Sequence, residues 1–465
     1  MNVLYSLLDV NNQRLDIIAQ EQIFTNNLNF VLTLSNDEIS SISDSIFDRF
    51  GFNILPRIHH NVKSLTLESA SMERILRVAD YPNLTKLKLF NFNKEIVSYY
   101  FKDDSIFKHI FKQQITDLIL IINEDNMEII RKDYTIKVFA FILTFFENLK
   151  HLTIIPSSIN NYPFISLYDL PSTIFSSLIL TKLYLPNLKF FLLICYNSTD
   201  GYDNQVVPLL RRMSHLEELT LYLRILNRPI FIDGTHLHNE ILIHMPRLHI
   251  FKFYITTENK IDDSIVHLSN DDIQRTFENL EHRQMTCFID YFNNYKAICR
   301  IFSLPFQFDR LEDITNHFPN IIFNYATHLK VYDKIPFKHE FFVRVARSFP
   351  LLQCFSVENL LPPFWIFNKP LRINDEWYSV VEYPHLISLD ISYSNIYYIE
   401  QFLNEAYTYL PCLTELKFSY NSLEFVTDNF ARGTTRRNCA KVKRLIAGNS
   451  IIIYSEKVYR YFPSM

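Results

Sequence analysis

The stretch that decides the fold is LTELKFSYNSL, residues 413–423. Its large apolar side chains stand at the first, fourth and sixth positions, Leu413, Leu416 and Phe418, and an asparagine follows three positions later. The alternation from Leu416 to Phe418 is typical of a short strand, because successive side chains of a strand point to opposite faces. We therefore expect Leu416 and Phe418 on a buried face and Lys417 on the opposite face.

The same spacing of apolar residues, L-x-x-L-x-L, recurs along the chain. Copies that begin two residues after a proline are Leu84/Leu87/Leu89, Leu248/Phe251/Phe253, Leu352/Phe355/Val357, Leu386/Leu389/Ile391 and Leu413/Leu416/Phe418. Copies without the proline are Val62/Leu65/Leu67, Leu149/Leu152/Ile154, Leu180/Leu183/Leu185, Leu216/Leu219/Leu221 and a degenerate Ala326/Leu329/Val331. Most copies start 22 to 36 residues after the previous one, and near Leu185 a second register, Leu188/Phe191/Leu193, competes with the first. Such a period indicates a repeat architecture.

Each repeat is predicted to contain a helix, a stop and a strand. Residues 340–349 and 401–410 place apolar side chains three and four positions apart, which favours helices, and each segment then meets a proline that ends it. One such unit cannot bury its inner face alone, so neighbouring units must stack. The pattern of residues 413–423 resembles the leucine-rich repeat. We therefore predict an α/β fold, an irregular leucine-rich-repeat-like solenoid with a parallel strand ladder and outer helices.

The composition argues against most enzyme classes. The 465 residues include five glycines, Gly51, Gly201, Gly234, Gly433 and Gly448, so dinucleotide fingerprints, phosphate-binding loops and nucleophile elbows cannot be formed. A barrel of alternating strands and helices would also carry glycines and polar catalytic residues at its strand ends. With 46 basic and 50 acidic side chains, the formal net charge of −4 gives no general attraction to nucleic acids or anionic membranes. We predict a protein without catalytic activity, cofactor, nucleic-acid partner or membrane partner.

Cysteine usage and apolar runs point to the inside of the cell. The six cysteines are dispersed with no close pair, so a disulfide framework is not expected. The first nine residues lack the basic region of a secretory signal, and no apolar run approaches the ~20 residues that span a bilayer. We expect a cytoplasmic protein that could also enter the nucleus.

The N-terminal segment carries a second pattern. Residues 3–19 read VLYSLLDVNNQRLDIIA, with apolar residues at helical spacing. This segment resembles the second half of an F-box, with one extra residue after Val10, while the opening Leu-Pro-x-Glu-Ile-Leu helix of that motif has no counterpart here. The resemblance implies docking on the Skp-type adaptor of a cullin-RING ubiquitin ligase through Val3, Leu4, Leu7, Leu8, Val10 and Leu15. An amphipathic helix that caps the first repeat is the alternative.

These patterns divide the chain into a short F-box remnant over residues 1–30, a connector over 31–60, a repeat solenoid over 55–430 and a C-terminal cap or tail over 431–465. The resemblance implies a substrate-recognition subunit of the ligase, which would bind a protein substrate; a free-standing leucine-rich-repeat scaffold is the alternative. The outward positions of the predicted strands would form the substrate-binding strip, chiefly through Phe90, Tyr222, Tyr254, Glu358, Asp390 and Lys417.

Two polar clusters have residue types that could suggest further sites. The histidines at positions 236, 238, 244 and 249 lack a cysteine or paired carboxylate that would complete a zinc site, so no metal site is predicted. The basic residues between Arg432 and Arg444 are interpreted as a solvated face or cap rather than a nucleic-acid patch.

Overall fold

The structure is a computed structural model. It describes residues 14, 17–18, 20–33, 39–92, 100, 105, 107–122, 145–156, 185, 187–260, 268–278, 280, 284–292, 296–361, 379–447 and 455–465. The chain divides into two compact units. Unit 1 comprises residues 1–287 and 294–303, and unit 2 comprises residues 288–293 and 304–465.

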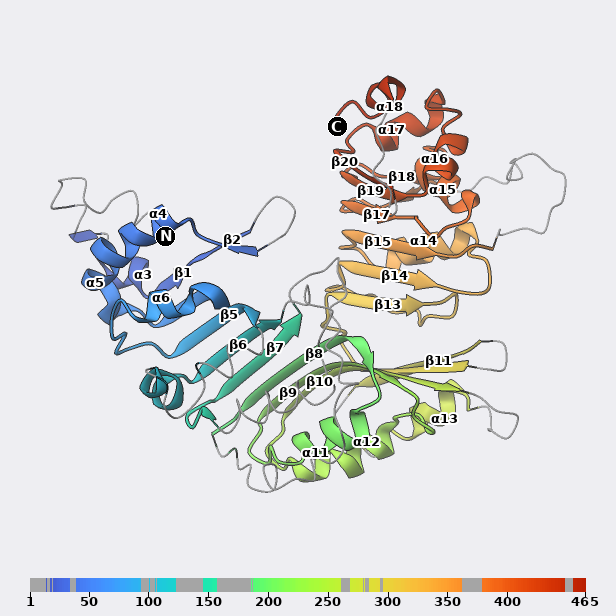
Figure 1. The fold of residues 1–465 in the computed structure, drawn as a ribbon. Coiled ribbons are helices and arrows are strands. Elements are labelled where there is room, and N and C mark those ends of the chain that lie inside the picture. The colour runs from blue at the N-terminus through green and yellow to red at the C-terminus, as the bar shows by residue number, and fades with distance from the viewer. Residues whose placement is uncertain are drawn as a thin grey trace. The chain divides into compact units, whose positions relative to one another are not determined.

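Unit 1 is built on a mainly parallel sheet (Figure 1). In spatial order, the described strands of this sheet are β1 (Asn27–Asn29), β4 (Ser64–Glu68), β5 (Lys86–Phe92), β6 (Asp117–Ile122), β7 (His151–Pro156), β8 (Phe190–Thr199), β9 (Glu218–Leu226), β10 (Ile250–Lys260), β12 (Lys296–Ser303) and β11 (Met285–Phe292). Residues of β11 from Phe288 onward are assigned to unit 2. A separate antiparallel pair joins β2 (Val31–Thr33) and β3 (Ile39–Ser41).

Helical segments of unit 1 connect these strands, and α11 and α12 lie along one side of β8 to β10 (Figure 1). The described segments are α3 (Gln22–Thr25), α4 (Asp44–Arg49), η1 (Phe50–Ile54), α5 (Leu55–Ile58), η2 (His59–Asn61), η3 (Ser69–Ser71), α6 (Met72–Leu76), η4 (Ile110–Gln114), η6 (Tyr202–Val206), α11 (Val207–Leu210), α12 (Gly234–Glu240), η7 (Leu242–His244) and α13 (Asn270–Arg275). The π-helical turns η1, η4 and η6 show that many connectors here are short and irregular.

Unit 2 repeats the parallel arrangement. Its strands run in the order β13 (Arg310–Ile314), β14 (His328–Tyr332), β15 (Cys354–Glu358), β17 (Ser388–Asp390), β19 (Glu415–Phe418) and β20 (Arg444–Ala447), with a second small pair of β16 (Val381–Glu382) and β18 (Thr408–Tyr409). Its helical segments are α14 (His339–Ser348), α15 (Ile396–Leu403), α16 (Tyr420–Val426), η8 (Gly433–Thr435), α17 (Arg436–Cys439) and α18 (Glu456–Tyr461). The molecule is therefore a mixed α/β protein with a large parallel sheet, consistent with a leucine-rich-repeat-like fold.

The strand register follows the predicted apolar frame. Leu65, Leu87, Leu118, Leu152 and Phe191 are consecutive cross-strand partners, and all five are buried. In unit 2, Phe355 pairs with Leu389, Leu389 with Leu416, and Leu416 with Leu445. The frame positions of neighbouring strands therefore lie directly opposite one another here too. Stacking equivalent side chains between rungs buries apolar surface that one unit would leave exposed.

The frame also occurs where the sequence prediction left gaps. Ile115, Leu118 and Leu120 form a buried copy on β6, and near Leu185 the competing register is used, since Phe191 pairs with Leu152. Residues 180 and 183 of the other register lie outside the described residues. The long interval between the copies that start at Leu248 and Ala326 contains β12, which pairs antiparallel with β10. The ladder is therefore not parallel throughout.

A tight turn precedes several of the strands. The backbone carbonyl of the residue before the proline accepts a hydrogen bond from the first apolar residue of the frame: Tyr81 O from Leu84 N at 3.1 Å, and Phe349 O from Leu352 N at 3.2 Å. Proline at the second position of such a turn is preset for it and cannot continue the helix. The predicted role of proline as a stop between helix and strand is confirmed at Pro350, because α14 ends at Ser348. It is wrong at Pro82, because α6 already ends at Leu76.

The helix predictions have different outcomes. The helix expected over residues 340–349 is α14 (His339–Ser348), which buries Phe341, Phe342 and Val345. The helix expected over residues 401–410 is wrong: α15 ends at Leu403, and β18 (Thr408–Tyr409) follows. The side chain of the N-cap residue Asn395 accepts a hydrogen bond from Tyr397 N, and the helix begins at Ile396, five residues earlier than predicted.

The predicted segment boundaries near residues 30, 60 and 430 stay predictions, because the division into units runs elsewhere along the chain.

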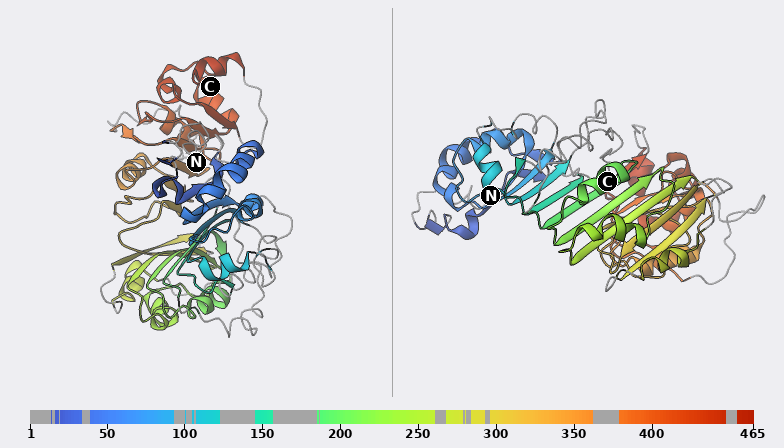
Figure 2. Two further views of the ribbon diagram at one scale, coloured as in Figure 1. Left: turned by 90° about the vertical axis from the view of Figure 1, so that its left-hand side faces the viewer. Right: turned by 90° about the horizontal axis from the view of Figure 1, so that it is seen from below.

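Among the described helices, none combines the length and apolar character needed to cross a bilayer. The views in Figure 2 show the strands of unit 1 as one continuous row, so the face opposite the helices is a broad surface of strand residues.

Candidate protein-binding surface

Each strand of the two ladders has an inner and an outer face. The inner face carries the frame residues, and the outer face carries the side chains between and after them, because side chains alternate along a strand. We call this outer set the outward strip.

The outward strip of unit 1 begins as a mixed surface. Phe90 on β5 is half-buried, and the Lys88 ammonium lies 4.7 Å from its ring centroid. Burial, together with nearby Lys86, lowers the pKa of Lys88. Further along, the ring of His151 stacks on Phe190 at 4.3 Å. These side chains offer apolar area and charge at the same site, which suits contact with a protein.

The predicted exposure of Tyr222 and Tyr254 is wrong. Both side chains lie at outward positions of β9 and β10, yet their exposed fraction is 0%. The rings form an aromatic row with their neighbours. The ring centroid of Tyr222 lies 4.9 Å from that of Tyr196 and 4.8 Å from that of Tyr254, and the centroids of Tyr254 and Phe302 are 6.1 Å apart. Large rings on adjacent strands bury one another, so side-chain alternation alone does not predict exposure. The aromatic row is therefore part of the packing of unit 1.

The outward strip of unit 2 is lined by ion pairs. Glu358 on β15 is half-buried and receives the Lys330 ammonium at 2.7 Å. Arg310 pairs with Glu312 on β13 at 2.6 Å, and both side chains are largely buried. Most of the charge predicted to meet a partner is thus balanced within the strip, which reduces its contribution to non-specific attraction.

The middle of this strip carries small side chains. Cys354 and Ser388 are cross-strand partners on β15 and β17, and Ser356 is the partner of Asp390. Asp390 is half-buried and accepts a hydrogen bond from Ser392 N at 3.1 Å. Lys417, also half-buried, lies on the next strand opposite Asp390. Three of the six predicted substrate-binding residues, Glu358, Asp390 and Lys417, therefore lie on one face of unit 2.

Glu415 and Arg444 extend this surface and were not predicted as site residues. The carboxylate of Glu415 accepts a hydrogen bond from Ser388 Oγ at 2.9 Å and lies 3.0 Å from Arg444 Nη1 and 3.8 Å from Lys417 Nζ. Arg444 opens β20, a further rung within the segment expected to be a cap or tail. The signal was present in the sequence, since Val442, Leu445 and Ala447 follow the frame.

His328 begins the same strip on β14. Thr327 Oγ1 lies 2.8 Å from its Nδ1. Burial is the main cause that lowers the pKa of His328 to about 4, and the adjacent Arg310 adds to it. The imidazole is therefore neutral at physiological pH.

The cysteines do not form a catalytic group among the described residues. Burial raises the pKa of the Cys287 thiol to about 11 and also raises the pKa of Cys299 and Cys439, so these thiols are poor nucleophiles. Cys412 is exposed in the turn after Pro411, and Cys354, at an outward strand position, is half-buried. Within the described ranges, no cluster of three or more His, Cys, Asp and Glu side chains could hold a metal ion.

The six predicted adaptor-binding residues, Val3, Leu4, Leu7, Leu8, Val10 and Leu15, lie outside the described residues. The chain that follows them is anchored to unit 1: Asn61 Nδ2 donates to Gln20 O at 3.0 Å, and β1 pairs with β4. Ile17 and Ile23 in this region are 67% and 75% exposed.

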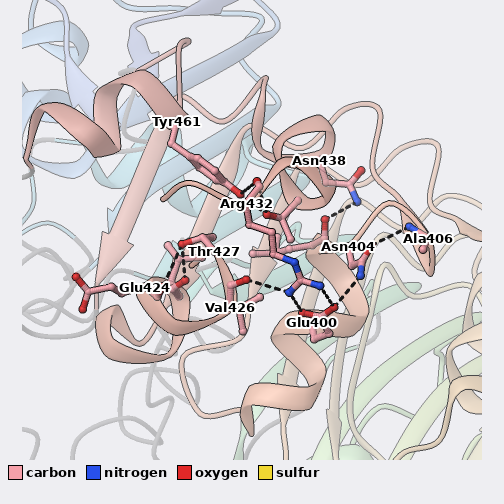
Figure 3. Close-up of polar contacts among 12 residues, drawn as sticks. Glu400, Asn404, Ala406, Glu424, Val426, Thr427, Arg432, Asn438 and Tyr461 are labelled. Carbon is pink, nitrogen blue, oxygen red and sulfur yellow. Dashed lines mark hydrogen bonds and ion pairs between the residues drawn. The ribbon is translucent and has the colours of Figure 1, made fainter. Parts of the chain in front are cut away.

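A buried polar network holds the end of unit 2 together (Figure 3). The guanidinium of Arg432 binds the carboxylate of Glu400 through two contacts, at 2.5 and 2.8 Å, and Asn404 Nδ2 donates to the same carboxylate at 2.7 Å. Asn438 donates to Thr408 O at 2.7 Å. Because Glu400 is 4% exposed, its charge is stabilised by these donors rather than by water. The network is structural and leaves Arg432 unavailable to a partner.

No protein-family model and no curated protein matches this chain. Among solved structures, the chain is similar to a chain of the crystal structure of the Rad7 and Elc1 complex in yeast. The identity is 13%, the match covers 91% of this chain and 88% of that chain, and the TM-score is 0.33. At these values, fold and function must be argued from this chain alone.

Proposed function

We propose that this chain is a substrate-recognition subunit of a cullin-RING ubiquitin ligase. Its N-terminal segment would bind a Skp-type adaptor, and the outward strip of its repeats would bind a protein substrate, with no catalytic group of its own. The observation that carries the proposal is the combination of the F-box-like pattern at residues 3–19 with strand ladders whose outward strip includes the half-buried Phe90, Glu358, Asp390 and Lys417.

Exposed apolar side chains support the adaptor-binding role. Ile17, Ile18, Ile23 and Phe24 are 40% to 75% exposed and immediately follow or overlap the F-box-like pattern. Apolar side chains gathered in one exposed segment are typical of an interaction site. The second of the two predicted functions, a free-standing leucine-rich-repeat scaffold, would leave this segment without a partner.

The test is copurification of the full chain with a Skp-type adaptor. The double variant Ile17→Asp with Ile23→Asp should lose the adaptor, because two charges would be placed in the apolar contact. The matched control is Ile230→Asp with Ile243→Asp, which changes two isoleucines of unit 1 that are 67% and 62% exposed. This control should retain the adaptor.

Two results would contradict the proposal: failure of the unmodified chain to copurify with the adaptor, or equal adaptor binding by both double variants. The first result would favour the free-standing scaffold. Both variants should melt at the temperature of the unmodified chain, since all four side chains are exposed.

A further inference from the structure

Charge is unevenly distributed along this chain. Residues 431–465 contain eight Lys and Arg side chains and a single acidic one, Glu456, whereas the preceding 430 residues contain 38 basic and 49 acidic side chains. The C-terminal 35 residues therefore carry a formal charge of +7 and the rest of the chain −11, which together give the net charge of −4. A segregation of this size creates a local positive field that the net charge conceals.

The fold places these cations on the last rung of unit 2. Segments α17, α18 and β20 lie together at the C-terminal end of this unit (Figure 1). Tyr461 of α18 donates to Arg432 O at 3.0 Å, and Ser464 Oγ donates to Ala440 O at 2.8 Å, so α18 packs on the segment that carries α17. Seven of the eight cations are exposed: Arg436, Arg437, Lys441, Lys443, Arg444, Lys457 and Arg460.

Most of these cations lack a carboxylate partner. Arg444 and Arg460 pair with Glu415 and Glu456 at 3.0 and 2.6 Å, and Arg437 reaches Glu405 only at 4.0 Å. The other four, Arg436, Lys441, Lys443 and Lys457, form no ion pair with any described residue. The outward strip of the same unit is different, because its cations are largely balanced by neighbouring carboxylates.

Two arginines of this surface are held in place by aromatic rings. The guanidinium of Arg436 lies 5.6 Å from the ring centroid of Tyr461, and that of Arg437 lies 4.5 Å from that of Tyr409. Stacking of this kind fixes the guanidinium plane and leaves its N–H groups free to donate to carboxylates. Tyr461 is buried and Tyr409 is half-buried with Arg437 against its ring, so neither ring is placed to stack on a nucleic-acid base.

Protection of a sheet edge is the simpler explanation for basic residues near β20, since charged side chains discourage pairing with another strand. That explanation accounts for Lys443 and Arg444. It does not account for Arg436 on α17 or Lys457 on α18, which lie outside the strand.

We propose that Arg436, Arg437, Lys441, Lys443 and Lys457 form a basic surface that binds an acidic segment of a protein partner, rich in Asp and Glu. The inference deepens the proposed function, on which it rests, by naming the chemical class of substrate segment that the repeats would recruit. Carboxylates of an extended acidic peptide would supply counter-charges to Arg436, Lys441, Lys443 and Lys457, which form no ion pair with the described residues. They would also reach Arg437, whose only carboxylate among the described residues is Glu405 at 4.0 Å.

The experiment uses the full chain and a fluorescent ten-residue polyglutamate peptide, with polyglutamine and single-stranded DNA of ten nucleotides as comparison probes. The test variant combines Arg436→Gln, Lys441→Gln, Lys443→Gln and Lys457→Gln. The matched control combines Lys63→Gln, Lys150→Gln, Arg212→Gln and Arg247→Gln, which are exposed residues of unit 1 and give the same change in net charge.

We expect the unmodified chain and the control to bind polyglutamate with equal, salt-sensitive affinity, and the test variant to bind at least about tenfold more weakly. Equal binding of polyglutamate by the two variants would overturn the proposal. The proposal would also fail if the unmodified chain bound polyglutamine as tightly as polyglutamate. If the unmodified chain bound the DNA more tightly than polyglutamate, and the test variant lost that binding, the proposal of an acidic peptide would be wrong and the ligand of this surface would be a nucleic acid. The adaptor-binding variant Ile17→Asp with Ile23→Asp should bind polyglutamate normally, so failure here is distinguishable from failure of the proposed function.

Discussion

The two units build their strands on the same apolar frame but use the outward strip differently. In unit 1 the strip includes Ile119 and Leu192 at outward positions and ends in the buried aromatic row around Tyr222. In unit 2 the strip is polar, and pairs such as Lys330 with Glu358 balance its charges. The inner positions are fixed by packing between rungs, whereas the outward positions can diverge, and there the two units acquire separate surfaces.

The strongest test of the shared frame is a charge on the inner face of unit 2. Leu416 is 0% exposed and lies between Leu389 and Leu445. Leu416→Asp should lower the free energy of unfolding by about 4 kcal/mol or more, because a carboxylate would be buried without a partner. The measurement is urea unfolding of the full chain, followed by circular dichroism.

The outward neighbour provides the control. Lys417→Ala should change the free energy of unfolding by less than about 1 kcal/mol, since its ammonium lies 3.8 Å from Glu415 and that carboxylate keeps its closer partner Arg444 at 3.0 Å. Equal destabilisation by the two substitutions would mean that the inner and outward faces have been assigned incorrectly.

A second test compares two aromatic residues that were both predicted to be exposed. Tyr222→Ala should destabilise unit 1 by about 3 to 5 kcal/mol, because it leaves a cavity in the aromatic row. Phe90→Ala should cost about 1 kcal/mol, since Phe90 is half-buried at the edge of the strip. Thermal melting of the two variants side by side gives the difference, and a larger loss for Phe90→Ala would contradict the burial assigned to the row.

Most of the inner face could be predicted from the sequence, and less of the outer face. Apolar spacing identified Leu87, Leu219 and Leu389 as buried, because an L-x-L strand has one way to bury its side chains in a stacked repeat. Exposure at outward positions depends on the neighbouring strands. Tyr222 is buried because Tyr196 and Tyr254 stand beside it, and no pattern within its own repeat contains that information.

Contacts between repeats were also beyond the sequence argument. Asn83, Asn148 and Asn187 each stand directly before the first apolar residue of a repeat, and each side chain donates to a carbonyl of the preceding repeat at 2.6 to 3.0 Å. The buried pair of Glu400 and Arg432 joins residues 32 positions apart. Local periodicity reports the shape of one unit, whereas such pairs follow from how units stack.

A third test uses pH and addresses the polar strip of unit 2. The pKa of His328 is about 4 in the folded chain, against an ordinary value near 6.5 when unfolded. Below pH 6.5 the unfolded chain therefore takes up a proton that the folded chain does not, so stability is complete above pH 6.5 and falls as the pH decreases towards 4. The loss should be about 2 to 3 kcal/mol at pH 4.

The variant His328→Gln should remove this part of the pH dependence, measured as the free energy of unfolding at pH 7 and pH 4.5. His249→Gln, at an exposed position of unit 1, should retain the pH dependence of the unmodified chain. If the free energy of unfolding changed equally with pH in both variants, burial of His328 would not be a cause of the pH dependence.

The smallest expected effect concerns the ion pair that most clearly separates the two strips. Lys330 and Glu358 lie 2.7 Å apart on adjacent strands, and both side chains are partly exposed. Their coupling should therefore contribute less than about 1 kcal/mol, and 0.5 M salt should weaken it. A double-mutant cycle of Lys330→Ala and Glu358→Ala measures it directly. A coupling well above 1 kcal/mol would mean that the polar strip of unit 2, like the aromatic row of unit 1, is part of the packing and has little freedom to evolve as a binding surface.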